Sequence, residues 1–275
     1  MPFMKKQEGN SPFSVRKYLY WAGINVRSQF AYAGIVLESI FTFVVQLLLL
    51  LTLWKAIYGD ASVINGRSFT QMMQYVLIST TITSLYTYPS IHFLAMDIKR
   101  GNIAYDILKP IDFQTQFVFK NIGRIAAVAL TILPFSVLFL LVLNLGSTEG
   151  SYLCALISAV VGALTCIFFD FVLGSLCFWT ENSWGLTFVR QFALRFLSGA
   201  FIPPDFLPRG VDVALREYLP FSGMVYWPIR FFTAKFSWNE FAFHIAIQLL
   251  WCVFLLFAGR YLYRRIRFRI QINGG

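Results

Sequence analysis

Six long apolar stretches constrain this chain more than any other feature of its sequence. Each is long and apolar enough to cross about 30 Å of hydrocarbon as a helix. Hydrophobic residues make up 57 % of the 275 residues and charged residues only 13 %, so no soluble core of this size could hide the apolar surface. The sequence predicts an all-α polytopic membrane protein, a single transmembrane domain over 1–275 with six transmembrane helices. We expect these helices near residues 33–56, 69–95, 124–145, 152–179, 185–202 and 241–262.

The positions of the cations predict how the chain is oriented. With six spans, seventeen of the 23 Lys and Arg residues fall on one side of the membrane and six on the other. Lys and Arg collect in cytoplasmic loops, so we expect a multi-pass protein of the cytoplasmic membrane with both termini in the cytoplasm. The same bias accounts for the net charge of +10. The positive charge therefore implies membrane lipid as a partner, and no binding to nucleic acid is needed to explain it.

The N-terminal region predicts a helix that lies in the membrane interface. Residues 1–12 are polar and are not followed by the short apolar core of a cleavable signal peptide. Residues 13–30 interleave aromatic and cationic side chains, which suits a helix with its cations toward lipid phosphates and its rings at the acyl boundary. The alternative is an ordinary extension of the first span.

The chain contains no recognisable catalytic or metal-binding motif. We find no HExxH, GxSxG or GxxxxGK[ST] sequence, and the four cysteines lie within apolar spans without a CxxC pair. We interpret each histidine as a hydrogen-bonded residue at a helix end rather than as a catalytic residue or a metal ligand. We therefore expect no catalytic residue, no metal and no cofactor in this chain. These cysteines and histidines are Cys154, Cys166, Cys177, Cys252, His92 and His244.

Two acids fall in or near apolar spans, where an ionisable side chain is costly and is a functional hypothesis by default. Glu38 lies near the cytoplasmic end of the first span and could reach the interface or pair with a basic residue. Asp170 lies deeper in the fourth span and must face protein or a water-filled path. It either forms a structural pair with Arg190 or Arg195, or it lines a transport path.

The second span is rich in hydroxyl side chains, three of which share one face. Thr80, Ser84 and Thr87 follow the i, i+4, i+7 spacing of a helix. They either bond back to carbonyls of their own helix or line a translocation path. Together with Glu38 and Asp170, they form the translocation path that we expect.

The cytoplasmic loop at 97–123 predicts a short helix across the face of the membrane. Gly101 ends the helix that leaves the second span, and Lys109–Pro110 closes a segment over 102–108. This segment presents Ile103, Tyr105 and Leu108, either to a docked soluble partner or to lipid. A second helical piece over 112–122 leads into the third span.

The outer segment at 203–238 contains five prolines and two short amphipathic pieces, near 209–218 and 221–234. Broken helices at membrane depth are tolerated only where they are buried in protein or line a cavity. We therefore expect a re-entrant helical hairpin between the fifth and sixth transmembrane helices.

This order of elements resembles the type-2 permease family of ABC exporters, and in particular its ABC-2 family transporter protein subgroup. The outer segment resembles the family pattern SGxFxPxxxxP…LP at Ser198, Gly199, Phe201, Pro203, Pro208 and Leu219–Pro220. The cytoplasmic loop resembles a second family pattern at Gly101, Leu108, Lys109 and Pro110. The resemblance covers nearly the whole chain.

The resemblance implies a permease driven by separate ABC ATPase (nucleotide-binding) subunits, which bind ATP and magnesium. It implies a second permease protomer, in a homodimer or heterodimer, and export of a hydrophobic or amphipathic drug, lipid, glycolipid or peptide. The outer gate would comprise Gly199, Phe201, Pro203, Pro208 and Pro220. The ATPase would dock on Gly101, Ile103, Tyr105, Asp106, Leu108, Lys109 and Pro110.

Two other functions are consistent with parts of the sequence. One is a proton-coupled secondary transporter that uses Glu38 or Asp170, although the halves of the chain show no convincing internal repeat. The other is a non-transporting assembly factor or sensor. An ABC ATPase that is encoded beside this chain and copurifies with it would exclude the secondary transporter.

Overall fold

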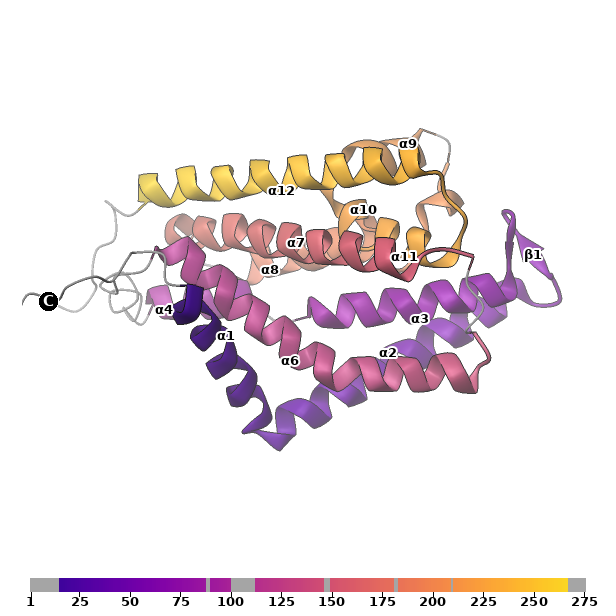
Figure 1. Ribbon diagram of the computed structural model, residues 1–275, viewed down its shortest axis with the longest axis horizontal. Helices are drawn as coiled ribbons and strands as arrows, with labels where there is room; N and C mark the ends of the chain where they lie inside the picture. The colour runs from indigo at the N-terminus through magenta and orange to yellow at the C-terminus, as the bar shows by residue number, and fades with distance from the viewer. Residues whose placement is uncertain are drawn as a thin grey trace, which may run out of the picture.

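The computed structural model describes residues 15–87, 90–99, 112–145, 149–180, 183–208 and 210–266. These residues are almost entirely helical, apart from a small hairpin of β1 (Val63–Ile64) and β2 (Arg67–Ser68). The longer helices are α1 (Val15–Phe30), α2 (Ala33–Tyr58), α3 (Phe69–Leu85), α4 (Ser90–Lys99), α6 (Phe113–Val142), α7 (Tyr152–Thr180), α8 (Ser183–Phe192) and α12 (Trp238–Ile266). The helices α3, α7 and α12 run along the long axis of the molecule, whereas α1 and α6 slant across it (Figure 1).

Four of the described helices are long and apolar enough to cross a membrane, namely α2, α6, α7 and α12. They match the first, third, fourth and sixth expected spans. Large apolar side chains are exposed on their outward faces, such as Leu130, Leu141 and Leu250 with exposed fractions of 63 %, 71 % and 65 %. Such faces are stable in lipid and costly in water, so the chain is an all-α membrane protein.

The second expected span, 69–95, is two helices in the structure. A capping box between Ser68 and Gln71 starts α3, and α3 ends at Leu85 before α4 begins at Ser90. Pro89 has no backbone N–H with which to continue a helix. The 17 residues of α3 span only about 26 Å.

The third and fifth expected spans also have different bounds. The third, expected at 124–145, starts earlier because Asp112 caps α6 by accepting from the backbone N–H of Thr115, so the expected piece at 112–122 is its first part. The fifth, expected at 185–202, is α8 followed by the π-helix η1 (Ala193–Leu197). Gly199, at φ +82° in the turn that follows, ends it.

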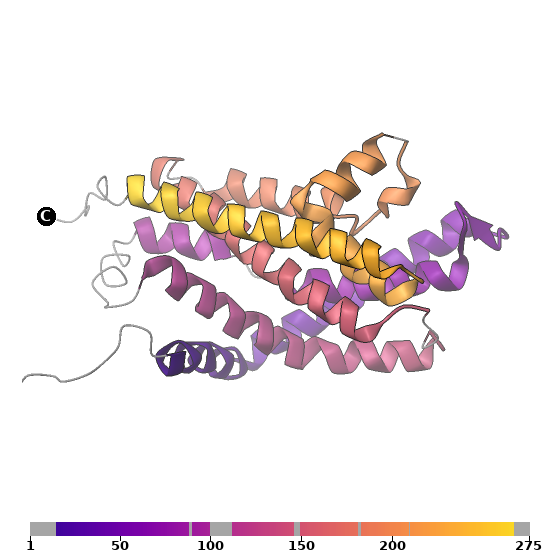
Figure 2. The ribbon, with the colours of Figure 1, turned by 45° about the horizontal axis from the view of Figure 1, so that its top comes forward.

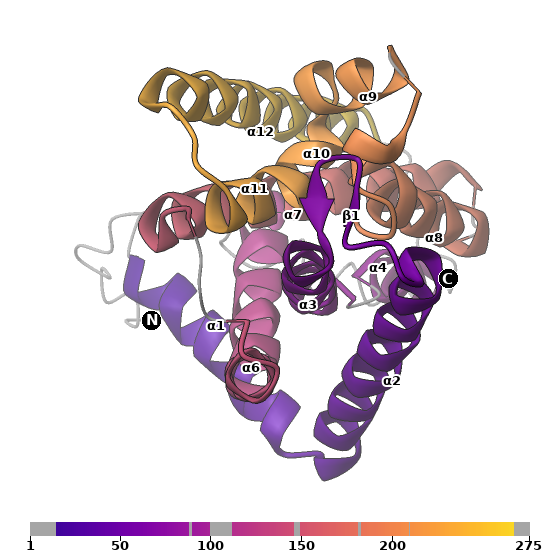
Figure 3. The same ribbon diagram turned by 90° about the vertical axis from the view of Figure 1, so that its right-hand side faces the viewer.

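The helix α1, which corresponds to the expected interfacial helix at 13–30, packs across α6. It then meets α2 at a sharp corner, from which the two helices diverge (Figures 1 and 3). The crossing is very close, because a Cβ on Gly123 of α6 would lie 2.4 Å from the backbone oxygen of Ala22. Tyr20 and Phe30 of α1 are exposed.

The outer segment folds back into the body of the protein. It comprises η2 (Pro204–Phe206), α9 (Val211–Val213), the π-helix η3 (Ala214–Tyr218), α10 (Pro220–Met224) and α11 (Tyr226–Thr233). The short helices α10 and α11 pack on α7, along which α12 also lies (Figure 2). Nearly all residues from Pro220 to Phe231 are buried, so this broken backbone is covered by protein, as its polar groups require.

Candidate functional site

A cavity of about 300 Å³ lies at the corner where α1 meets α2. Its walls come from α1, α2, α3, α4 and α6, so residues from Gln29 to Ile132 meet there in the folded chain. Most of the exposed surface of the lining is apolar, although six of the ten lining residues are polar. The lining residues are Gln29, Ile35, Glu38, Ser39, Thr42, Ser84, Thr87, Phe93, Val128 and Ile132.

Glu38 supplies the carboxylate of this corner cavity. It lies five residues into α2, about 8 Å along the helix from Ala33, and its side chain is exposed. No cation of the described residues forms a salt bridge with it, so the pairing with a basic residue considered above is not formed there.

The hydroxyl face of α3 is divided between cavity and core. Ser84 and Thr87 line the corner cavity with Glu38, whereas Thr80 is fully buried. Each of the three donates to the carbonyl four residues earlier, at 2.8 Å for Thr80, 2.7 Å for Ser84 and 3.0 Å for Thr87, which lies just beyond the end of α3. The structure therefore places two of these residues at the cavity and shows the local bonding for all three.

Asp170 does not line the corner cavity but forms a buried ion pair with Arg190 of α8. The two side chains are 5 % and 6 % exposed. Ser90 at the start of α4 donates to Asp170 at 2.6 Å, and Arg190 donates to the carbonyl of Tyr86 at the end of α3 at 2.6 Å. The pair thus fixes the break between α3 and α4 against α7 and α8.

Above the corner cavity, α2 packs tightly against α3 and α6. Phe43 and Leu47 are completely buried, and the ring of Phe43 meets the edge of Phe139 with centroids 6.4 Å apart. A second cavity of about 300 Å³ lies beyond this contact, between the outer parts of the same helices. Its lining residues are Leu51, Thr52, Lys55, Phe69, Thr70, Met73, Leu143 and Leu145.

The expected gate residues lie around the turn that follows η1. The carbonyls of Gly199 and Ala200 accept hydrogen bonds from Tyr75 and Ser79 of α3, at 2.6 and 2.7 Å. A Cβ on Gly199 would lie 2.7 Å from the ring of Pro204. Two hydroxyls of α3 therefore hold the turn at the SG motif.

The other gate residues have different surroundings. Phe201 lies under the guanidinium of Arg195, 5.5 Å from the ring centroid. Pro203 and Pro220 are buried, Pro220 as the first residue of α10. Pro208 is exposed and its carbonyl accepts from the N–H of Val211.

Sequence reasoning missed a polar cluster at the outer end, centred on Asp205. The carboxylate of Asp205 forms salt bridges with Arg67 of the hairpin and with Arg216 of η3 at 3.3 Å, and it accepts from Tyr226 of α11 at 2.9 Å. We call these four residues the Asp205 cluster. It joins the β-hairpin to the outer segment across 138 residues of sequence.

The Asp205 cluster raises the pKa of two of its members, Arg67 and Tyr226. Burial lowers the pKa of Arg67, but the charge of Asp205 outweighs it and the pKa lies above its ordinary value. Burial and the same carboxylate raise the pKa of Tyr226 to about 12. Tyr226 is therefore a neutral donor to Asp205 at physiological pH.

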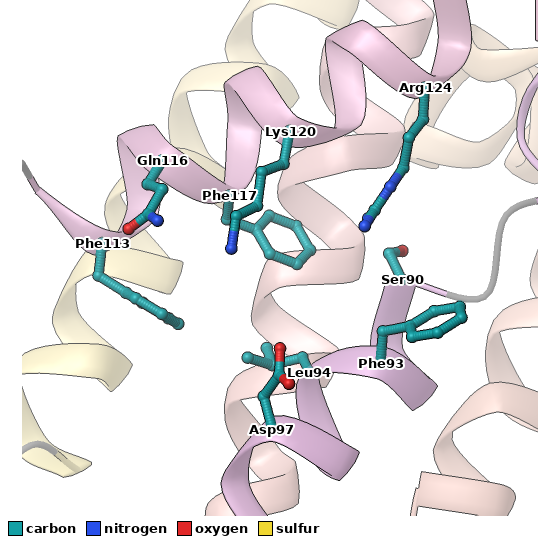
Figure 4. A pocket seen from close by; sticks show the side chains of 9 residues that line it. All are labelled: Ser90, Phe93, Leu94, Asp97, Phe113, Gln116, Phe117, Lys120 and Arg124. Carbon is teal, nitrogen blue, oxygen red and sulfur yellow. The ribbon is translucent and has the colours of Figure 1, made fainter. Parts of the chain in front are cut away.

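A smaller cavity of about 40 Å³ lies between α4 and α6. Figure 4 shows Lys120 and Arg124 reaching from α6 toward α4, which carries Phe93 and Asp97. Arg124 lies 5.9 Å from the ring centroid of Phe93. The expected docking residues Gly101, Ile103, Tyr105, Asp106, Leu108, Lys109 and Pro110 lie outside the described residues.

A family model described as "ABC-2 family transporter protein" matches residues 43–274, which is most of the chain. No curated protein matches the chain.

Proposed function

The chain belongs to the ABC-2 family of transporter proteins, and from this premise we propose that it is the permease subunit of an ATP-driven exporter. It moves a hydrophobic or amphipathic substrate (a drug, lipid, glycolipid or peptide) out across the cytoplasmic membrane. The single observation that carries this proposal is the family match over 43–274. The cavities between α2, α3 and α6 support it.

The power source is a separate ABC ATPase, which binds ATP and magnesium. It docks on the cytoplasmic loop through Gly101, Ile103, Tyr105, Asp106, Leu108, Lys109 and Pro110. Both ends of this loop continue directly into packed helices, α4 and α6. Movement of the docked ATPase therefore acts on α4, whose first residue Ser90 is bonded to the Asp170–Arg190 pair.

The substrate path runs along α2 in a dimer of permeases, with both termini of each protomer in the cytoplasm. The substrate enters the corner cavity and leaves through the outer cavity that contains Lys55. The buried side chains of Phe43 and Leu47 on α2 separate the two cavities. The path opens when this part of α2 moves away from α6. Gly199, Phe201, Pro203, Pro208 and Pro220 form the outer gate.

Copurification tests the docking step. An ABC ATPase encoded beside this chain is coexpressed with the tagged permease, and the ATP hydrolysis of the purified complex is compared with that of the ATPase alone. We expect the ATPase to copurify and to be stimulated, and the double variant Tyr105→Ala/Leu108→Ala to lose both. Tyr261→Ala, which removes an exposed tyrosine from α12, is the matched control. Unchanged association in the double variant would refute the docking assignment.

A further inference from the structure

We propose that the corner cavity binds a lipophilic cation, with Glu38 as its counter-ion. This inference rests on the proposed function and narrows its substrate class from amphipathic molecules in general to amphipathic cations. It is carried by the shape, the lining and the charge of the cavity.

The walls of the corner cavity favour an apolar ligand. Ile35, Val128 and Ile132 line it with the ring of Phe93, and a volume of about 300 Å³ is within the range of small-molecule sites. Apolar surface that is removed from water on binding provides most of the affinity in such a site.

The charge of the cavity favours a cation. Among the described residues, Glu38 is the one carboxylate of the lining, and none of them forms a salt bridge with it. The hydroxyls of Ser39, Ser84 and Thr87 each donate to the carbonyl four residues earlier, at 2.7 to 3.0 Å, and so are not directed at the carboxylate. A cation beside a carboxylate is strongly attracted where apolar walls lower the dielectric.

Two nearby cations of the described residues line a different cavity, which contains a carboxylate. Lys120 and Arg124 line the neighbouring small cavity together with Asp97 (Figure 4). Lys120 and Arg124 do not line the corner cavity itself. The division gives the two cavities different charge, and only the corner cavity has an acid without a basic lining residue.

A pair of ions of the same shape and opposite charge tests the proposal. Radiolabelled tetraphenylphosphonium and tetraphenylborate are bound to the full-length permease in lipid nanodiscs, and binding to empty nanodiscs is subtracted. We expect saturable binding of the phosphonium and weaker binding of the borate. Glu38→Gln should weaken phosphonium binding about tenfold or more without weakening borate binding.

Two control variants locate the effect. Asp60→Asn removes an exposed acid just beyond the other end of α2 and should leave phosphonium binding unchanged. Thr42→Trp fills the cavity from its exposed position on α2 and should abolish binding of both ions. Each variant must elute as a monodisperse peak, which is expected because neither Glu38 nor Thr42 is buried.

Three results would overturn the proposal: equal binding of the two ions by the unaltered permease, unchanged phosphonium binding in Glu38→Gln, or equal losses in Glu38→Gln and Asp60→Asn. The assay contains no ATPase and no ATP, so it does not depend on export. A permease that binds the cation but shows no ATP-driven transport would contradict the proposed function and not this inference.

Discussion

Asp170 and Arg190 show how single residues hold this fold together. The sequence left two interpretations of Asp170 open. It could form a structural pair with Arg190 or Arg195, or it could line the transport path. The structure shows the pair with Arg190. Breaking a buried pair leaves one charge uncompensated, which typically costs about 3–5 kcal/mol.

We therefore expect Asp170→Asn to lower the yield of folded protein and the unfolding temperature in detergent. The double variant Asp170→Asn/Arg190→Gln leaves no lone charge and should recover part of the loss. Ser90→Ala removes only a hydrogen bond to Asp170 and should cost about 1 kcal/mol. A stable Asp170→Asn protein that has lost transport would instead place Asp170 on the path.

Gly199 gives a second prediction at the residue scale. Its φ of +82° disfavours any side chain, and a Cβ would press on Pro204. Gly199→Ala should destabilise the protein by roughly 1–3 kcal/mol and loosen the turn held by Tyr75 and Ser79. Thermal unfolding measures the first effect, and Gly185→Ala, where a Cβ meets open space, is the control. Equal unfolding temperatures would show that the turn tolerates a side chain.

The sequence predicted a helix correctly where the helix is long and apolar enough to be recognised from its hydropathy alone. The runs that became α2, α6, α7 and α12 have clear hydropathy, and their existence follows from the cost of polar backbone in lipid. The second and fifth expected spans were wrong in their bounds, because α3 ends at Leu85 and the turn with Gly199 at positive φ ends η1. Hydropathy is insensitive to such breaks.

The contact between α1 and α6 gives a prediction at the element scale. Gly123→Leu places a side chain where the backbone oxygen of Ala22 lies 2.4 Å from the Cβ position, so α1 must move away. We expect faster amide hydrogen exchange over residues 15–30, with little change in α7. Gly23→Leu meets open space on α1 and should not change the exchange. Unchanged protection in Gly123→Leu would show that α1 is not held by this contact.

The candidate site could be predicted only in part, because it depends on how distant parts of the chain pack together in the whole molecule. The sequence drew attention to Glu38, Ser84 and Thr87, and the structure brings them to one cavity. The sequence also suggested Thr80, but this residue is buried. Residues that share a helix face can lie on different turns, and the sequence does not show which turn lines the cavity. Asp205 was missed because its partner Arg67 lies 138 residues away, and no local pattern encodes such a contact.

At the scale of the whole molecule, the chain is a membrane domain of the ABC-2 transporter family, and the two transport mechanisms considered for it differ in their source of energy. An ABC permease moves substrate only with its ATPase, whereas a proton-coupled carrier needs only itself and a pH gradient. In the structure Asp170 is bonded to Arg190, which leaves Glu38 as the acid available for proton coupling.

Transport in proteoliposomes tests the source of energy most directly. The permease is reconstituted alone or with the coexpressed ABC ATPase, and a panel of fluorescent amphiphiles of positive, zero and negative charge is followed across the membrane. We predict transport that requires both the ATPase and hydrolysable ATP, and that stops when the hydrolytic residue of the ATPase is replaced. Transport by the permease alone, driven by an imposed pH gradient and lost in Glu38→Gln, would contradict the account.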